Sequence, residues 1–161
     1  MPDPSRIDEQ LRDRALQQAF AGDDIGARQT IGGMVDRECL GVAWKGILCI
    51  QSDRGDVQGV KDTILACPDD SLLVSPDYHQ LPLHFARAGN VTGAIEIAQI
   101  MGPRGTLSRM MIPMVLMEKG DFVGARDAAS HINDETQRSL IMNMVDEDQR
   151  KRERSEPSSQ H

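Results

Sequence analysis

One short pattern recurs four times along this chain of 161 residues. A glycine is followed by Asp or Asn and, three residues after that, by a second glycine and a small residue. The copies read GDDIGA at Gly22, GDVQGV at Gly55, GNVTGA at Gly89 and GDFVGA at Gly120. Their first glycines are separated by 33, 34 and 31 residues. A period in this range is typical of stacked helical repeats rather than of one compact bundle.

Apolar segments with helical spacing flank each copy of this glycine repeat. They precede the copies at 11–20, 40–50, 81–88 and 110–117, and follow them at 25–35, 57–67, 91–101 and 122–132. The first glycine can adopt a positive φ and end one helix, while the Asp or Asn beside it can cap the next helix. We expect the second glycine and the small residue to let two antiparallel helices approach closely. Each copy therefore predicts the turn of a helical hairpin, since a phosphate-binding loop would need a preceding strand and usually a following lysine.

The composition agrees with a helical core. Aromatic residues make up only 3% of the chain, so its core must come from aliphatic residues and the nine methionines, a set that favours helices over strands. We predict an all-α fold, an α-solenoid of about four antiparallel helical hairpins plus a C-terminal capping helix. The repeat domain is expected over residues 6–146, between an N-terminal tail at 1–5 and a disordered charged tail at 147–161.

The two ends of the repeat domain carry capping signals. Ser5 and Asp8 have the spacing of a capping box for the first helix. Asn133 or Asp134 can cap a final helix that ends near Val145. Such a terminal helix covers the last hairpin of a solenoid.

Two features interrupt the periodic pattern. Residues 68–77 form its longest break, which predicts a surface loop inserted between the second and third repeats. Pro82 and Pro113 each lie seven residues before a repeat glycine. A proline inside a helix removes a backbone hydrogen bond, so each of these helices is expected to be kinked or to start late.

The period, the glycine–acid turn and the small residue after the second glycine resemble tetratricopeptide-like (TPR-like) repeats. The resemblance covers roughly residues 6–146, although the aromatic positions usual in the first helices are mostly Gln, Leu or Met here. In that family a small residue begins the second helix of each pair, and the first helices line a concave groove. The resemblance implies a protein-interaction role for this chain.

Counting from the repeated small residue places the family's groove positions on this chain. The first two hairpins offer Glu9, Arg12, Asp13, Leu16, Val42, Lys45 and Cys49, and the last two offer His79, Leu83, Arg87, Leu107, Met110, Met111, Met114 and Met117. The peptide-binding groove that we predict consists chiefly of Lys45, His79, Leu83, Arg87, Met110, Met114 and Met117. Methionines suit surfaces that adapt to apolar partners. The same methionines could instead be core residues, or be covered by the final helix with its Leu140, Ile141 and Met144.

Charge and hydropathy exclude several classes of protein. The net charge of −7 and the scarcity of aromatic side chains disfavour nucleic-acid binding, which needs a basic face. No apolar run approaches the roughly 20 residues that span a bilayer, and the charged N-terminus has no signal-peptide core. We therefore expect a cytoplasmic protein without a membrane or nucleic-acid partner.

The sequence holds no strong catalytic, cofactor or metal motif. Cys39 and Cys49 flank an apolar helix and are expected to be reduced and buried. Cys67, His79 and His84 are the one combination from which a metal site could be built, but paired close ligands such as CxxC are missing. We predict no catalytic residue, no cofactor and no metal.

Three functions follow from these observations. The first is a non-enzymatic adaptor, scaffold or regulator that binds a protein or peptide segment, such as an amphipathic helix, in its groove. The second is a secretion-type chaperone for an apolar segment, which resembles this chain in size and charge. The third is a metal-dependent regulator or enzyme that uses Cys67, His79 and His84. A homodimer through the methionine-rich end would also fit.

Overall fold

The computed structural model describes residues 4–73 and 76–155, and their regular structure is helical throughout. This confirms the predicted all-α class. The α-helices are α1 Pro4–Phe20, α2 Asp24–Ile31, α3 Arg37–Asp53, α4 Val57–Ala66, α5 Gln80–Arg87, α6 Val91–Ile100, α7 Thr106–Glu118, α8 Phe122–Ser130 and α9 Glu135–Ser155. Three single-turn 3₁₀ helices connect them, namely η1 Asp70–Leu73, η2 Pro76–His79 and η3 Gly102–Gly105.

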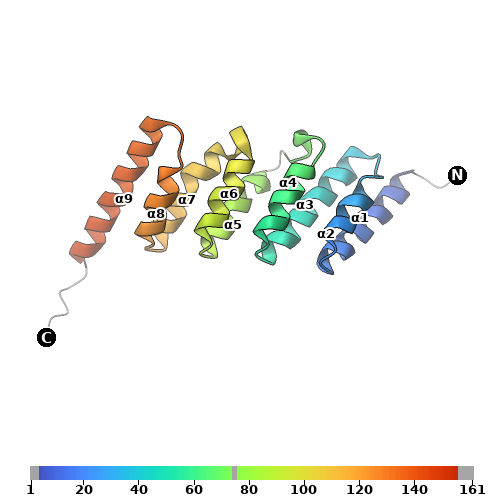
Figure 1. Ribbon diagram of the computed structural model, residues 1–161, viewed down its shortest axis with the longest axis horizontal. Coiled ribbons are helices and arrows are strands. Elements are labelled where there is room, and N and C mark those ends of the chain that lie inside the picture. Colours follow the sequence, from blue (N-terminus) through green and yellow to red (C-terminus); the bar gives the residue numbers. More distant parts are fainter. Residues whose placement is uncertain (1–3, 74–75, 156–161) are drawn as a thin grey trace. The chain divides into compact units, whose positions relative to one another are not determined.

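The chain divides into two compact units, and the division falls within α5. In the first unit, Met1–Leu81, the hairpin α1–α2 packs on the hairpin α3–α4. The first helices α1 and α3 contact each other in one layer, and the second helices α2 and α4 contact each other in the other layer (Figure 1). Hairpins therefore stack within this unit in the manner of a helical repeat.

The second unit, Pro82–His161, repeats this layering. The helix α7 packs against α8 and contacts α6 and α9, while α8 contacts α6 and α9. The helices α7 and α9 run in the same direction, with α8 antiparallel to both (Figure 1). One solenoid over residues 6–146 stays a prediction.

The four glycine repeats form the hairpin turns. Each first glycine has a φ between +71° and +86°. The following Asp23, Asp56, Asn90 or Asp121 accepts a hydrogen bond from the backbone N–H of the second glycine at 2.8–2.9 Å. The predicted helix end and N-cap are therefore confirmed in all four turns.

The second glycine of each turn is needed chiefly for a reason other than the one we expected. A Cβ atom at Gly26, Gly59 or Gly124 would lie 2.1–2.4 Å from a carboxylate oxygen of the capping aspartate in its own turn. The glycine thus makes room for the cap, and at Gly59 also for the Gln51 side chain of the neighbouring α3, whose Nε2 would lie 3.1 Å from the Cβ atom. The small residue that follows, Ala27 in the first turn, is fully buried like its three counterparts and supplies the close packing.

The side chain of Ser5 lies outside the described part of the structure, so the predicted N-terminal capping box stays a prediction. Asp8 has another role. It is 3% exposed, and its Oδ2 accepts hydrogen bonds from the backbone N–H groups of Val35 and Asp36. Asp8 therefore closes the connection between α2 and α3, and α1 begins earlier than expected, at Pro4.

The predicted tail at 147–161 is wrong for its first part. The helix α9 is capped by Asp134, as predicted, but it continues to Ser155 instead of ending near Val145. Residues 156–161, like residues 1–3, lie outside the described part of the chain. Arg152 holds the last turns of α9 in place.

The two prolines behave differently. Pro82 lies in the first turn of α5, which starts at Gln80, so this helix starts late. Pro113 lies inside α7, where it has no N–H to donate to the preceding turn. The predicted surface loop at 68–77 is not simply exposed, because η1 packs against α3.

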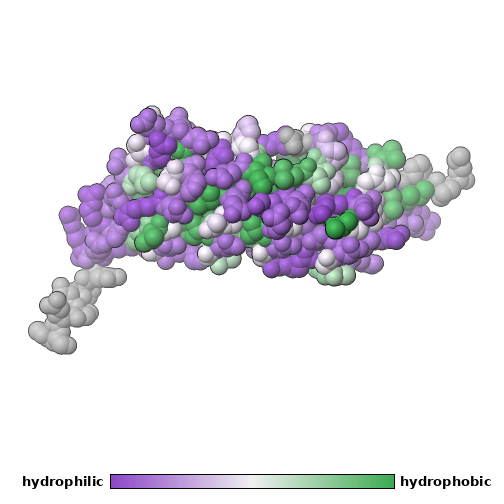
Figure 2. Space-filling view, in the orientation of Figure 1, coloured by the Kyte–Doolittle hydropathy of each residue, from purple (hydrophilic) through white to green (hydrophobic). Residues whose placement is uncertain are grey.

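The faces formed by the second helices are mostly hydrophilic. In Figure 2 the face of each unit that carries these helices shows small, separated apolar patches among polar side chains. Exposed apolar residues of these helices include Ile25, Leu65 and Val123. Isolated residues of this kind are common on protein surfaces and do not by themselves mark a binding site.

Candidate interaction surfaces on the first helices

The helix α7 separates its apolar residues into two groups. Ile112, Val115 and Leu116 are buried in the second unit. On the other side Leu107 is 52% exposed and Met114 is 42% exposed, while Met110, Met111 and Met117 are half-buried. None of these four methionines is a core residue of the described chain.

The helix α9 extends this apolar surface. Met144 of α9 and Met117 of α7 line the same open hollow, together with Glu147, Asp148 and Lys151. Leu140 lies one turn before Met144 on α9 and is exposed. The methionine face is defined as Leu107, Met110, Met114 and Met117 of α7 with Leu140 and Met144 of α9. The final helix borders this face and leaves Met114 exposed.

Two arginines hold α9 in place. Arg126 of α8 donates two hydrogen bonds to Asp146 at 2.9–3.0 Å. Arg152 donates to the backbone carbonyl of Met117 at 2.9 Å, and its guanidinium lies 5.4 Å from the ring centre of Phe122. These contacts explain why the charged end of α9 is helical. They join residues that are 20 to 35 positions apart, so the local composition gave no signal for them.

The corresponding surface of α3 is partly covered by the chain itself. Leu73 of η1 and Tyr78 of η2 are buried, and with Leu48 and Leu72 they line a cavity of only about 20 Å³, room for about one water molecule. An open hollow of about 480 Å³, with Gly41 and Val42 in its lining, lies next to it and shares Lys45 and Leu72. Residues 70–73 and 76–79 therefore lie beside the α3 surface.

Ion pairs fix this covering segment to α3. Arg37 donates to Asp69 at 2.7 Å and also to the hydroxyl of Ser71, and Lys45 pairs with Asp77. Hydrogen bonds from Ser71 and Arg37 lower the pKa of Asp69 to about 2. The hydrogen bond to Asp77 raises the pKa of Lys45. The two cations of this surface, Arg37 and Lys45, therefore each form an ion pair with an acidic residue of the connection between α4 and α5.

The predicted groove residues fall into different environments. Lys45 is exposed but paired with Asp77, and His79 is half-buried at the end of η2. Arg87 is exposed. Leu83 is fully buried, so its assignment to a groove is wrong. A single groove through all predicted positions stays a prediction, because Lys45 and His79 belong to one unit and the other positions to the second.

The cysteines and histidines do not form a metal centre in the described residues. There, no group of three or more His, Cys, Asp and Glu side chains is placed to hold a metal ion. The alternative function that would use Cys67, His79 and His84 therefore has no such group of side chains to support it. Cys49 is exposed and Cys39 half-buried, against the expected burial. Loss of hydration raises the pKa of both thiols, which disfavours the nucleophilic thiolate.

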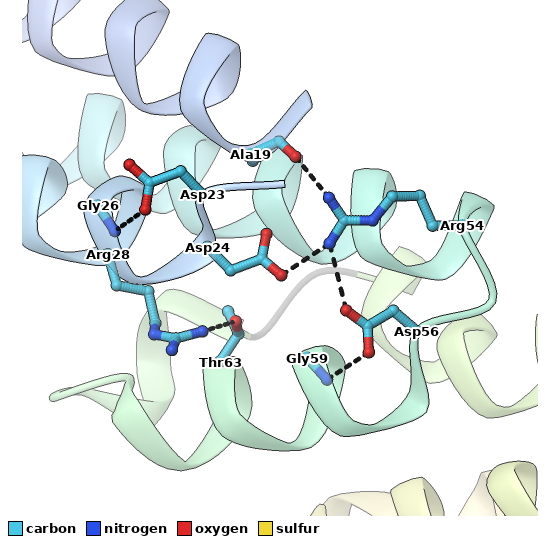
Figure 3. A network of polar contacts seen from close by, with 9 residues as sticks. All are labelled: Ala19, Asp23, Asp24, Gly26, Arg28, Arg54, Asp56, Gly59 and Thr63. Carbon is cyan, nitrogen blue, oxygen red and sulfur yellow. Dashed lines mark hydrogen bonds and ion pairs between the residues drawn. The ribbon is translucent and has the colours of Figure 1, made fainter. Parts of the chain in front are cut away.

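A polar network joins the two turns of the first unit (Figure 3). Arg54 donates to the backbone carbonyl of Ala19 at 2.6 Å, to Asp24 at 2.7 Å and to Asp56 at 3.2 Å. Asp56 is also the cap of α4. In the second unit, Lys119 takes the place before the turn glycine and donates to the carbonyl of Arg87. These contacts connect successive hairpins and carry no sign of a ligand site.

Within the described residues, the longest helices are too polar to cross a bilayer. No family model, no curated protein and no solved structure matches this chain. The resemblance to tetratricopeptide-like repeats therefore stays a prediction, and any function must be argued from the surfaces described above.

Proposed function

We propose that this chain is a non-enzymatic protein-interaction module that binds an apolar protein or peptide segment on the methionine face. The observation that carries the proposal is the exposure of Met114 and Leu107 on the side of α7 that faces away from the core. These residues lie together on one side of a helix, and a contiguous exposed apolar patch often marks an interaction site.

The chemistry of methionine supports a peptide partner. Its side chain is unbranched and polarizable, and it can adapt its shape to different apolar groups at low cost. The parallel helices α7 and α9 place Met117 and Met144 along one open hollow. Charged side chains of α9, Glu147, Asp148 and Lys151, line the same hollow, and a groove with apolar and charged parts suits an amphipathic helix.

The proposal is tested by comparing two matched charge substitutions. Met114→Glu places a carboxylate on the methionine face, whereas Val123→Glu places one at an exposed position of α8 outside that face. Both variants should keep the helical circular dichroism spectrum and melting temperature of the wild type within a few degrees. Each protein is then used to capture partners from a lysate of the source organism, with chemical crosslinking and mass spectrometry.

The expected result is a partner captured by the wild type and by Val123→Glu but lost with Met114→Glu. Capture that is equal for all three proteins would overturn the proposal. Light scattering on the purified proteins separates a homodimer from a foreign partner. A dimer that Met114→Glu converts into a monomer would assign the methionine face to self-association.

A further inference from the structure

The methionines of this chain are concentrated on the surface of the second unit. Seven of the nine lie in Pro82–His161, and six of these seven are on α7 and α9. Met114 is 42% exposed and Met144 is 37% exposed. The other four on these helices are half-buried, namely Met110, Met111, Met117 and Met142. Met101 of the same unit and Met34 of the first unit are buried, so the chain holds both solvent-accessible and shielded thioethers.

A solvent-accessible thioether is a site of oxidation by peroxides. The sulfur lone pair attacks one oxygen of hydrogen peroxide, and the S–O bond forms as the O–O bond breaks. The second oxygen takes the proton of the attacked oxygen and leaves as water. The sulfur is oxidised to the sulfoxide and the peroxide is reduced. Methionine sulfoxide reductases return the sulfoxide to the thioether, with a thiol as the reductant.

The shape of the surface gives peroxide access to side chains of both helices. The open hollow lined by Met117 and Met144 has a volume of about 210 Å³, several times the roughly 30 Å³ that a water molecule occupies in the liquid. Hydrogen peroxide is only slightly larger than water and can enter this hollow. Because the oxidant must reach the sulfur, the exposed Met114 and Met144 should react first and the buried Met34 and Met101 last.

Oxidation of the exposed pair changes the surface and leaves the core intact. The residues that pack α7 into its unit, Ile112, Val115 and Leu116, are buried and carry no sulfur. A sulfoxide oxygen at Met114 or Met144 can be hydrated, because both side chains are exposed. An apolar partner, however, would have to strip water from the sulfoxide dipole without replacing its hydrogen bonds, which is unfavourable.

We propose that Met114 and Met144 form a reversible oxidation site, with hydrogen peroxide as the oxidant, that converts the methionine face from an apolar to a polar surface. The release of a bound partner by this oxidation rests on the proposed function. The two residues come from α7 and α9, so one oxidant changes both sides of the face. Leucine at these positions would be as apolar as methionine but could not be converted.

The first part of the test follows the oxidation itself. The full chain, labelled with ¹³C at the methionine methyl groups, is treated with dilute hydrogen peroxide, and NMR and peptide mass spectrometry follow each methionine. Met114 and Met144 should react about tenfold faster than Met34 and Met101. Dithiothreitol added to each sample reduces oxidised cysteines such as the exposed Cys49 and leaves the sulfoxides. Circular dichroism should show a melting temperature within a few degrees of that of the untreated chain.

The second part of the test measures binding. Partner capture from the lysate is compared for the wild type and for the double variant Met114→Leu/Met144→Leu, each before and after peroxide. The two untreated proteins should capture equally. Peroxide should abolish capture by the wild type, and treatment with the reductases should restore it. The peroxide-treated double variant should keep most of its capture, because its exposed positions cannot be oxidised.

Three results would overturn the inference. The first is oxidation of Met34 or Met101 as fast as that of Met114 and Met144, and the second is loss of the fold when the exposed pair is oxidised. The third is equal capture by the oxidised wild type and the oxidised double variant, which would leave the interaction role standing. If the untreated chain captures nothing that Met114→Glu loses, the proposed function is wrong, and the oxidation rates and melting temperatures still decide whether this pair is the oxidation site.

Discussion

The helices α3 and α7 occupy equivalent places before their turns, but their exposed positions differ in chemistry. On α3 these positions are Val42, Lys45 and Cys49, and the neighbouring η1 packs against the helix, with two ion pairs from α3 to Asp69 and Asp77. On α7 the same positions are leucine and methionine, and Met114 is exposed.

The two units also differ in charge. The first unit has eight Lys and Arg residues against fourteen Asp and Glu residues, and the second has ten against eleven. Most of the net charge of −7 therefore belongs to the unit whose first helix is covered by an acidic segment. The second unit is nearly neutral, which suits a surface that binds apolar groups.

The comparison predicts its largest effect for truncation of an apolar residue on each surface. Leu73→Ala removes a buried side chain from the α3 cover and should lower the free energy of unfolding by about 2–4 kcal/mol. Met114→Ala should change it by less than about 0.5 kcal/mol, since Met114 is an exposed residue. Urea denaturation of both variants measures the difference. Equal losses would mean that the methionine face is part of the core.

The second largest difference is expected between the basic residues that precede the turn glycines of the two units. The quantity that should differ is the loss of folding free energy when each is replaced by alanine. Arg54→Ala removes three polar contacts in the first unit and is expected to cost about 1–2 kcal/mol. Lys119→Ala removes one exposed contact to a carbonyl and should cost less than about 0.5 kcal/mol. Thermal denaturation compares the two variants. A greater loss for Lys119→Ala would contradict the partners described for Arg54.

The border of the methionine face depends on Arg152. Arg152→Ala removes the hydrogen bond to the Met117 carbonyl and the contact with the Phe122 ring, at a cost of about 1 kcal/mol. Amide hydrogen exchange should become faster in the last turns of α9 and stay unchanged in α3. Arg150→Ala, which removes only a bond to the preceding turn of its own helix, serves as the control. Unchanged exchange in α9 would show that Arg152 does not hold the helix end.

The smallest effect concerns the acid that fixes the α3 cover. The pKa of Asp69 is lowered to about 2 from an ordinary value of 3.8, so the ionised carboxylate favours the folded cover. This contribution is present above pH 3.8 and is lost as the pH falls through 2. Amide exchange of Ser71, whose N–H donates to Asp69 at 2.8 Å, should become faster over that window. Asp69→Asn should remove this pH dependence, and a variant that keeps it would assign the effect to another group.

Much of the fold could be predicted because its determinants are local. The glycine repeats specified the helix ends, and Asp134 was a correct candidate for the cap of α9. Leu83 shows the limit of counting along a repeat. The count placed it in a groove, but its side chain is fully buried, because the direction of a side chain depends on where its helix begins and on what surrounds it.

The extent of α9 and the fate of the 68–77 insertion could not be predicted for a related reason. A charged segment such as 147–155 has no apolar residues to signal order, and its order comes from contacts with Met117 and Phe122. The insertion has polar residues typical of a surface loop, but its two leucines find a buried place on α3. In both cases the partner is a residue distant in sequence.

The sequence by itself determined that this protein is built of helical hairpins, since a glycine with positive φ and an N-cap side chain act within a few residues of each other. It also supplied the row of methionines on α7. Only the tertiary structure decided that Leu83 is buried, that Leu73 is buried beside α3 and that Met114 stays exposed. Burial depends on which distant segments come together, and no local pattern encodes that.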